Sequence, residues 1–339
     1  MKILITGISG RIGANLAKTL AEAGHSVRGL VWTHDKRLDK LAQLKLELIE
    51  GDLVKPEDVA EATQGVEVIY HLGAAFQGGG PFSNEQYFDI NLRGTFNLLE
   101  AARQQSKTLR QFFFASTDAL YNKYLPGGMS EPIREDALPP EPSGQYALTK
   151  TLGEQMSLGY QRTYGLPVTV FRFALVVAGD EILDFPQFRL SHWLKVYQQT
   201  KAAESLSVWR LLQMVKTNQE RLVIARDAQG RAWKKHIVDV RDIVHGLVGG
   251  LYNPNINGEV IQLAAPQPFT WDQAVPYLAD RLDLDYVDLH LSDRAPTFYE
   301  FDLAKARRLL NYNPQYDIFK MIDSAIAFRQ GNEMDVIPT

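Results

Sequence analysis

The stretch Lys2-Ile-Leu-Ile-Thr6-Gly7-Ile8-Ser9-Gly10-Arg11-Ile12-Gly13 decides the fold of this chain. Its apolar first half has the length of a buried strand, and the helical spacing of apolar residues over 12–23 predicts a helix directly after it. Gly7 permits a tight turn, Gly10 lets phosphates approach the backbone, and Gly13 lets helix and strand pack closely. Because a helix N-terminus also offers unpaired N–H groups, this stretch predicts a dinucleotide-binding site.

The same alternation of strand and helix continues along the chain. Strand-length apolar runs lie at 3–6, 27–32, 47–50, 66–72, 111–116 and 168–173, and helical spacing is found at 12–23, 56–63, 91–106 and 146–164. Buried strands alternating with amphipathic helices predict a Rossmann-type, doubly wound parallel sheet of the α/β class.

After about residue 175 this rhythm ends. Two aromatic-rich amphipathic segments, 185–199 and 204–218, follow, and apolar stretches at 236–240 and 259–263 are expected to rejoin the first sheet. We therefore predict a dinucleotide-binding domain at 1–175 plus 236–263. A smaller, mixed α/β substrate lobe is expected at 176–235 plus 264–339.

Composition excludes several classes of function. With 45% hydrophobic and 22% charged residues among 339, the profile is that of an ordinary globular protein. The net charge of −4 has the wrong sign for nucleic acid or anionic membrane, so we expect a small-molecule partner. Zero cysteines exclude thiolate chemistry and Cys-ligated zinc, and the seven histidines lack ligand spacing, so no metal is expected.

No apolar run approaches the ~18 residues of a membrane helix, and the apolar start of the chain reaches glycine too soon for a secretory signal. We therefore expect a cytoplasmic protein that does not enter a membrane.

The end of the second strand bears on the form of the cofactor. An acid usually stands there and binds the adenosine ribose, whereas this chain has Val31 and Trp32. The basic residues nearby favour NADP over NAD; they are Arg11, Arg28, Lys36 and Arg37. Because Asp35 is an acid in the same stretch, NAD stays an alternative cofactor. Cofactor contacts are predicted in the glycine loop and after the second, third and fourth strands, at Gly7, Ser9, Gly10, Arg11, Ile12, Gly13, Trp32, Asp52, Leu53, Leu72, Ala74 and Ala75.

The catalytic candidate is Tyr146-Ala-Leu-Thr-Lys150. Residues four apart share a helix face, so the ammonium can lower the pKa of the phenol from about 10 and also reach the cofactor ribose. The same spacing occurs at Tyr197/Lys201 and Tyr316/Lys320, which we interpret as helix-surface pairs. Only the first pair lies downstream of a strand that ends in hydroxyls, Ser116 and Thr117, at the edge where α/β proteins bind ligands.

These residues resemble the extended short-chain dehydrogenase/reductase superfamily, and within it the NAD(P)-dependent epimerase/dehydratase family. The resemblance covers most of the chain; it runs through 6–13, 51–53, 71–75, 91–95, 116–121, 135–136, 146–150 and Glu154, with weaker matches at 236–242, 258–259, Arg294 and 302–305.

The resemblance implies hydride exchange with NAD(P) at a secondary alcohol or carbonyl, often of a nucleotide sugar. It makes Thr117 the hydrogen-bond partner of the substrate oxygen, Tyr146 the acid/base, Lys150 its activator and Ser116 a neighbouring support. Asn91 joins Tyr146 and Lys150 at the cofactor. Substrate contacts are expected at Asp118, His236 and Arg294. By analogy, the helices at 91–106 and 146–164 imply a homodimer.

Two departures from the family pattern narrow the reaction. Thr117-Asp118-Ala119 stands where sugar-nucleotide dehydratases carry Thr-Asp-Glu, so the eliminating base is missing, and epimerisation or carbonyl reduction is left. The family's Asn-containing motif is replaced by residues 172–179, which leaves a carbonyl reductase acting on a non-nucleotide aldehyde or ketone as an alternative. A non-catalytic NAD(P)-sensing regulatory protein is the alternative from another class, although Tyr146 and Lys150 count against it.

Overall fold

The computed structural model describes residues 1–33, 35–76, 80, 82–137, 139–199, 210–211, 213–214 and 219–338. Its main sheet has seven parallel strands in the order β11-β6-β5-β4-β1-β2-β3, which confirms the predicted Rossmann-type α/β fold. The strands are β1 (Lys2–Thr6), β2 (Ser26–Val31), β3 (Glu47–Glu50), β4 (Val68–His71), β5 (Gln111–Thr117), β6 (Val168–Phe173) and β11 (Val260–Leu263).

The strand order reverses between β1 and β4. From β1 the chain proceeds to β2 and β3 on one side, then returns to place β4, β5 and β6 on the other. Thr6 at the end of β1 is in register with His71 at the end of β4. Ligands of such sheets bind at the carboxyl ends of the strands where the order reverses, so the glycine loop after Thr6 stands at that position.

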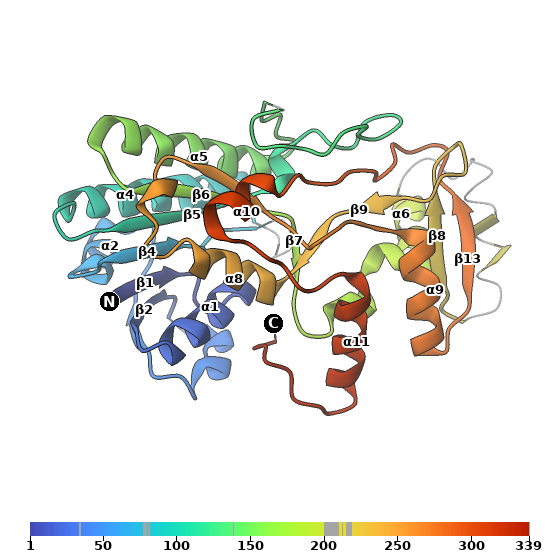
Figure 1. Ribbon diagram of the computed structural model, residues 1–339, viewed down its shortest axis with the longest axis horizontal. Helices are drawn as coiled ribbons and strands as arrows, with labels where there is room; N and C mark the ends of the chain where they lie inside the picture. The colour runs from blue at the N-terminus through green and yellow to red at the C-terminus, as the bar shows by residue number, and fades with distance from the viewer. Residues whose placement is uncertain are drawn as a thin grey trace.

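Helices cover both faces of the sheet (Figure 1). In this view α4 and α5 lie above the sheet and α1 and α8 lie below it. The bounds are α1 (Arg11–Glu22), α2 (Pro56–Thr63), α3 (Asn84–Phe88), α4 (Gly94–Gln104), α5 (Gln145–Tyr164) and α8 (Val240–Gly249), with a π-helical turn over Asp89–Arg93. Successive strand residues point to opposite faces, so Phe112 and Phe114 pack in the layer of α2, α4 and α5 while Phe113 packs in the opposite one.

A separate hydrophobic core, built from residues between Val177 and Ala325, forms the smaller lobe on the right of Figure 1. Its elements are α6 (Leu190–Gln199), β8 (Leu222–Arg226), β9 (Lys234–Lys235), β12 (Phe269–Thr270), α9 (Trp271–Leu282), β13 (Tyr286–His290) and α11 (Ile318–Arg329). Strands β7 (Leu175–Val177) and β10 (Ile237–Asp239) contribute side chains to both cores. Helix α10 (Ala304–Leu310) packs on α8 and β11. Short 3-10 turns occur at Lys36–Leu41, Asp118–Leu120, Glu181–Asp184, Pro186–Phe188 and Pro254–Ile256.

The two stretches expected to rejoin the main sheet behave differently. Strand β11 pairs with β6 and extends the main sheet, as predicted. Strand β10 does not, because it pairs in parallel with β7, whose backbone groups need a partner after the chain has left β6. Most of the predicted segment 204–218 lies outside the described residues.

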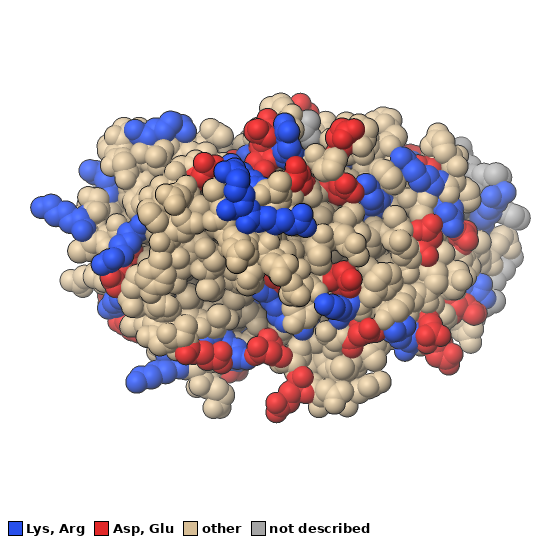
Figure 2. Space-filling view, viewed as in Figure 1, with Lys and Arg blue, Asp and Glu red and all other residues tan. Residues whose placement is uncertain are grey.

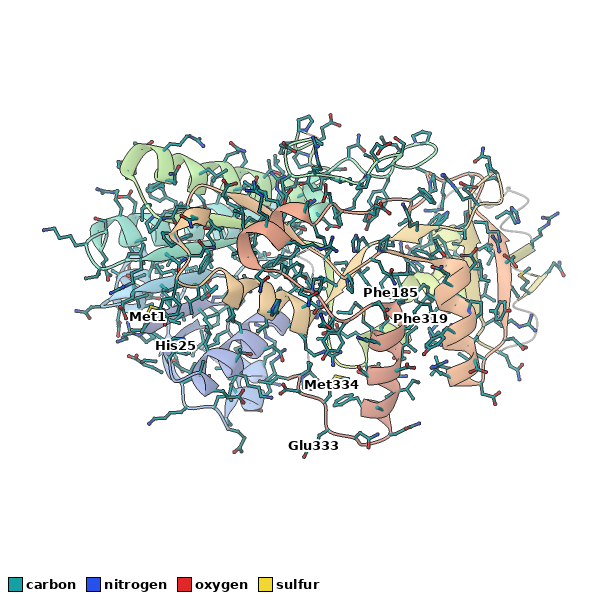
Figure 3. The ribbon with its side chains drawn as sticks, in the orientation of Figure 1. Met1, His25, Phe185, Phe319, Glu333 and Met334 are labelled. Carbon is teal, nitrogen blue, oxygen red and sulfur yellow. The ribbon has the colours of Figure 1, made fainter. Side chains whose placement is uncertain are left out.

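The end of the chain returns to the first helix. The Asn15 side-chain amide donates to the Ile337 carbonyl at 2.9 Å, and the Ile337 N–H donates to the Asn15 oxygen at 2.7 Å. Met334, labelled in Figure 3, lies in this returning segment and packs against the core below the sheet. The tail therefore ties the two lobes together beneath α1.

Charges of both signs are interspersed over the face shown in Figure 2. None of the helices in the described part of the chain is both long enough and apolar enough to cross a bilayer.

The contact between α1 and the glycine loop generates a first prediction. A Cβ on Gly13 would lie 2.2 Å from the Gly7 carbonyl oxygen, so Gly13→Ala is expected to lower the free energy of unfolding by about 1 to 3 kcal/mol, measured by urea denaturation. The control is Gly159→Ala in α5, where the added Cβ meets no described atom outside the helix backbone within 4 Å and stability should rise by about 0.5 to 1 kcal/mol. A Gly13→Ala protein as stable as the wild type would contradict this packing.

Candidate active site

The glycine loop forms a cradle at the N-terminus of α1. Gly7 adopts φ +71°, its carbonyl accepts from the Gly10 N–H at 3.0 Å, and α1 begins at Arg11 without a side-chain cap. A Cβ on Gly7 would approach Gly73, after β4, at 2.8 Å. The loop therefore presents uncapped N–H groups at the strand-order reversal, and these fit the phosphates of a dinucleotide.

Asp35, in the turn after β2, places a carboxylate beside the glycine loop. The Ser9 hydroxyl in the glycine loop donates to Asp35 Oδ2 at 2.6 Å, and Arg37 donates to both carboxylate oxygens, at 2.8 and 2.7 Å. The hydrogen bonds from Arg37 hold the pKa of Asp35 well below its usual range. An ionised carboxylate thus lies beside the loop that would hold the pyrophosphate.

Arg28 and Arg11, two of the other basic residues near β2, have partners of their own. Arg28 is buried and donates to the carbonyls of Ala62 and Gln64 at 2.8 and 3.0 Å and to the Glu47 carboxylate at 2.8 Å. Arg11 forms an ion pair with Glu181 at 2.5 Å. Arg28 and Arg11, which favoured NADP in the sequence analysis, are therefore already paired within the protein.

The predicted contacts after β2 and β3 line an open hollow of about 500 Å³. Trp32 and Asp52 are among its lining residues, together with Thr33, Glu50, Gly51, Lys55 and Asp58. The Asp52 N–H donates to Asp58 Oδ2 at 2.8 Å, and Asp52 Oδ1 accepts from the Val54 N–H at 2.9 Å. Leu53 lies at the side of this turn, with its carbonyl accepting from the Asn97 amide at 2.9 Å.

The segment after β4, with Leu72, Ala74 and Ala75, is held by buried polar side chains. The Asn91 amide exchanges hydrogen bonds with the backbone of Ala75 at 2.8 and 2.9 Å and donates to Thr149 at 3.0 Å. Asn91 lies in the π-helical turn before α4, an irregularity that is frequent at functional sites. Through these hydrogen bonds Asn91 connects the backbone after β4 to α5.

Thr117 and Tyr146 meet at the carboxyl end of β5. Burial raises the pKa of Tyr146 to about 12, a hydrogen bond with the Thr117 hydroxyl opposes that shift, and the Asp118 carboxylate adds to it. Thr117 Oγ1 also accepts from the Ala119 N–H at 3.2 Å. In the free protein the phenol is therefore protonated and paired with the hydroxyl predicted to contact the substrate.

Lys150 lies one helical turn after Tyr146, on the same face of α5. Burial lowers its pKa to about 7, and the Glu154 carboxylate opposes the shift. Its ammonium nitrogen lies 4.2 Å from the centre of the Phe114 ring, which favours the cation. Negative charge developing on Tyr146 would favour protonated Lys150, so the proton affinities of the two residues are coupled.

Ser116 points away from Thr117 into a buried ionic network. Its hydroxyl donates to Glu154 Oε2 at 2.8 Å, and Glu154 is paired with Arg172 at 2.5 Å. Arg172 also donates to the Tyr121 hydroxyl at 2.6 Å. These contacts join β5, β6 and α5 directly beneath Tyr146 and Lys150, so the network fixes where the helix stands.

The three predicted substrate residues have different surroundings. Asp118 forms an ion pair with Lys123 at 2.6 Å. Arg294 lies with its guanidinium carbon 5.0 Å from the centre of the Tyr197 ring. His236 accepts from the Phe301 N–H at Nδ1, at 3.0 Å, and donates from Nε2 to the Ala265 carbonyl, at 2.8 Å. Burial lowers the pKa of His236 to about 4. Backbone partners on both ring nitrogens favour a structural role for His236.

Sequence reasoning missed two buried lysines beside Asp118. Lys123 Nζ lies 2.6 Å from the Asp118 carboxylate and 4.9 Å from the centre of the Tyr299 ring. Lys235 lies on the smaller lobe, where burial lowers its pKa to about 8 and the Asp118 carboxylate opposes that shift. A signal for Lys235 was present, since it alternates with Trp233 and Ile237, both buried, and therefore shares their face of the strand.

The glycine loop follows β1 beside the end of β4, and Thr117 with Tyr146 lies at the end of β5, on the same edge of the sheet. Residues 3–263 match the model of the NAD dependent epimerase/dehydratase family. The chain belongs to this family.

Relatives of this epimerase/dehydratase-family chain match it over nearly its whole length. It is 27% identical to the uncharacterized UDP-glucose epimerase YtcB of Bacillus subtilis (strain 168) over 343 residues, covering 97% of this chain and 98% of that protein. It is 24% identical to the UDP-glucuronate 4-epimerase of Thermodesulfobacterium geofontis (strain OPF15) over 346 residues, covering 97% and 96%. A crystal structure of a short-chain dehydrogenase/reductase superfamily protein from Agrobacterium tumefaciens with bound NAD has a TM-score of 0.82 and 27% identity, covering 98% of both chains.

These findings confirm the predicted family and the prediction of an NAD(P)-dependent enzyme of the extended short-chain dehydrogenase/reductase type. Within the described residues, no group of three or more His, Cys, Asp or Glu side chains could hold a metal ion.

The network beneath the site of this family member yields a stability prediction. Glu154→Gln leaves Arg172 buried without its carboxylate, so the free energy of unfolding should fall by about 3 to 5 kcal/mol, measured by chemical denaturation. The matched control is Glu100→Gln, which removes the partner of Arg103 at the surface and should change the free energy of unfolding little, because water screens an exposed ion pair. Equal costs for the two variants would show that the network does not support α5.

Proposed function

We propose that this protein is an NAD-dependent epimerase that inverts a secondary alcohol on the sugar of a nucleotide sugar, by oxidising it to a ketone and reducing the ketone back to the epimeric alcohol. The observation that carries the proposal is the convergence of Thr117, Tyr146 and Lys150 at the carboxyl end of β5, facing the glycine cradle at the reversal of strand order. We further propose that substrate binds between the lobe of residues 1–175 plus 236–263 and the lobe of residues 176–235 plus 264–339.

Each of the three side chains has a distinct task in this proposal. Tyr146 accepts the proton of the substrate hydroxyl as the alcohol is oxidised and returns it when the ketone is reduced. Lys150 stabilises the phenolate that forms on Tyr146, and the Thr117 hydroxyl holds the substrate oxygen in line with it. NAD, when bound, supplies the acceptor and donor of the hydride, and the uncapped start of α1 with Ser9, Gly10 and Arg11 would hold its pyrophosphate.

The surroundings of Asp118 support epimerisation over dehydration. Elimination of water needs an acid and a base beside the reacting carbon. Here the Asp118 carboxylate is engaged by Lys123 at 2.6 Å, and Ala119 follows it in place of a carboxylate. The site therefore retains the redox centre and lacks a free eliminating pair at these positions.

Relatives along the whole chain support a nucleotide sugar as substrate, since one is a UDP-glucuronate 4-epimerase and another carries the name of a UDP-glucose epimerase. Arg294, in the smaller lobe, offers a cation for the diphosphate. A simple carbonyl reductase would consume the cofactor, whereas an epimerase restores it in each turnover, so following reduced cofactor distinguishes the two.

Asp35 supports NAD over NADP as the cofactor. A carboxylate at the ribose accepts hydrogen bonds from both hydroxyls of NAD and repels a 2′-phosphate. Asp35 lies beside Ser9 of the cradle and neutralises Arg37, and Arg28 is directed into the protein. The NADP preference expected from the sequence rested on Arg11, Arg28, Lys36 and Arg37, and the partners of the three arginines favour NAD instead.

We also propose that the protein is a homodimer. Large apolar side chains on α3, α4 and α5 are exposed, namely Phe88, Phe96, Leu148, Leu152 and Tyr164. Exposed apolar residues that gather on neighbouring helices are typical of an interface. The two helices expected to pair with those of a second copy carry most of them.

The acid/base assignment is tested by Tyr146→Phe. Loss of the proton-transfer group should lower turnover of UDP-glucose or UDP-glucuronate by about 100- to 10,000-fold, measured by chromatography of the products, while NAD binding is retained in calorimetry. Tyr316→Phe is the control, because Tyr316 has the same spacing to a lysine yet packs under Arg241, 3.5 Å from its guanidinium carbon. Full turnover by Tyr146→Phe would contradict the proposed role.

The cofactor assignment is tested by Asp35→Asn. Removing the negative charge beside Ser9 should weaken NAD binding about tenfold. The ratio of NAD affinity to NADP affinity should also fall, because Arg37 loses its carboxylate partner and becomes available to a 2′-phosphate. Calorimetric titration with each cofactor measures both effects, and Asp39→Asn, at an exposed position in the adjacent turn, is the control. Tighter binding of NADP than NAD by the wild type would contradict the assignment.

A further inference from the structure

His71, at the end of β4, is a buried polar side chain that the proposed reaction does not use. It is 1% exposed, and each of its ring nitrogens contacts a threonine hydroxyl. Nδ1 lies 2.8 Å from Thr6 Oγ1 at the end of β1, and Nε2 lies 2.9 Å from Thr95 Oγ1 on α4. His71 therefore bridges the strand that leads into the glycine loop and the helix layer that covers one face of the sheet.

The partners of the two threonines decide which ring nitrogen carries the proton. Thr95 donates its hydroxyl proton to the Asn91 carbonyl at 2.7 Å, so the Thr95 oxygen is left to accept from Nε2–H of His71. Nδ1 then accepts from the Thr6 hydroxyl, and the Thr6 oxygen accepts from the Gly73 N–H at 3.0 Å. In this arrangement every donor of the chain of hydrogen bonds has an acceptor.

The other protonation states of His71 leave a buried proton unpaired. With a proton on Nδ1, the Thr6 oxygen would receive two N–H groups, and no other acceptor for its own proton is found among the described residues. An imidazolium has the same defect, and burial together with repulsion by the Lys150 ammonium lowers the pKa of His71 to about 3. Because an unpaired buried donor is costly, the Nε2–H tautomer is favoured.

The chain of hydrogen bonds reaches the candidate site at both ends. At one end Gly73 packs so closely on the glycine loop that a Cβ on Gly7 would approach it at 2.8 Å. At the other end the Asn91 amide donates to the Thr149 hydroxyl at 3.0 Å. Thr149 in turn donates to the Tyr146 carbonyl at 3.0 Å. Direct contacts therefore run without a break from the cofactor cradle to the first turn of α5.

A neutral His71 also suits the charge on Lys150. The centre of the Phe114 ring lies 5.7 Å from that of the His71 ring and 4.2 Å from Lys150 Nζ. Phe114 is fully buried, so a positive charge on His71 would repel the ammonium across an apolar ring. The tautomer fixed by the two threonines avoids this repulsion.

We propose that His71 is a positioning residue whose Nε2–H tautomer gives the chain of hydrogen bonds its direction and so couples the glycine loop to Asn91 and α5. NAD affinity then depends on Thr95, although Thr95 belongs to α4 and not to the loop that would hold the phosphates. The inference goes beyond the acid/base assignment and rests on the cofactor site of the proposed function.

The tautomer is tested by nitrogen-15 NMR of the full chain labelled at histidine. Correlations from the ring hydrogens on carbon to the two nitrogens show which nitrogen is protonated, and His71 is assigned as the ring whose signals move in both Thr6→Val and Thr95→Val. We expect a protonated Nε2 and an unprotonated Nδ1 at neutral pH. A proton on Nδ1, or on both nitrogens, would overturn the inference.

The coupling is tested by calorimetric titration with NAD. Thr95→Val removes the hydroxyl and nearly keeps the shape, and it should weaken NAD binding about 5- to 10-fold. Thr95→Ser keeps the hydroxyl and should restore most of the affinity. The matched control is Thr169→Val on β6, where a buried hydroxyl donates to the Ile256 carbonyl at 2.9 Å. It should lower the unfolding midpoint as Thr95→Val does and leave NAD affinity unchanged.

A double variant distinguishes coupling from two independent losses. Thr6→Val should also weaken NAD binding, and the variant with both substitutions should bind NAD about as weakly as the weaker single variant, because each breaks the same chain. Losses that multiply in the double variant, or an NAD affinity that Thr95→Val leaves unchanged, would contradict the coupling.

Failure of the proposed function has a different signature, since none of these measurements needs turnover. A wild type that binds NAD and epimerises neither sugar would lose the proposed reaction, whereas the tautomer and the ratios of NAD affinity would still decide the role of His71.

Discussion

The close approach of α1 to the glycine loop is the constraint on which the rest of the structure depends. A Cβ on Gly13 would lie 2.2 Å from the Gly7 carbonyl oxygen, so only hydrogen fits there. This approach sets the start of α1 against the ends of β1 and β4, with Gly73 packed on the other side of the loop. The same edge carries Thr117 at the end of β5, one strand beyond β4. Cofactor cradle and proton-transfer centre are therefore positioned by one sheet edge.

Buried charges organise the site behind that edge, and they differ in how they are neutralised. Glu154 and Arg172 form a complete pair that also holds Ser116, and this anchors α5 to β5 and β6. Lys123 is balanced by Asp118. Lys150 and Lys235 are both desolvated enough to have lowered pKa values. The paired charges support the scaffold, whereas we assign Lys150, for which the described residues provide no ion-pair partner, to the reacting phenol.

Features set by local spacing were predictable from the sequence. The strand, glycines and helix of residues 2–23 are contiguous, and Tyr146 and Lys150 share one helix, so periodicity alone brought them together. Pairings across the chain were not predictable in this way. Ser9 meets Asp35, Arg28 turns inward to carbonyls of residues 61–64, and β10 pairs with β7, all through long-range contacts. The burial of Lys235 likewise depends on a long-range contact, because its hydrogen-bond partner Gln187 lies 48 residues earlier in the chain.

The most direct test of the central claim follows the hydrogen on the reacting carbon. UDP-glucose and UDP-glucuronate, each carrying deuterium at position 4, are incubated with the protein and unlabelled NAD, and the epimers are analysed by mass spectrometry and NMR. Oxidation and reduction at one carbon predict an epimer that keeps its deuterium, with no net build-up of reduced cofactor. Epimer that has exchanged the label for solvent hydrogen, or the absence of any epimer from both sugars, would contradict the account.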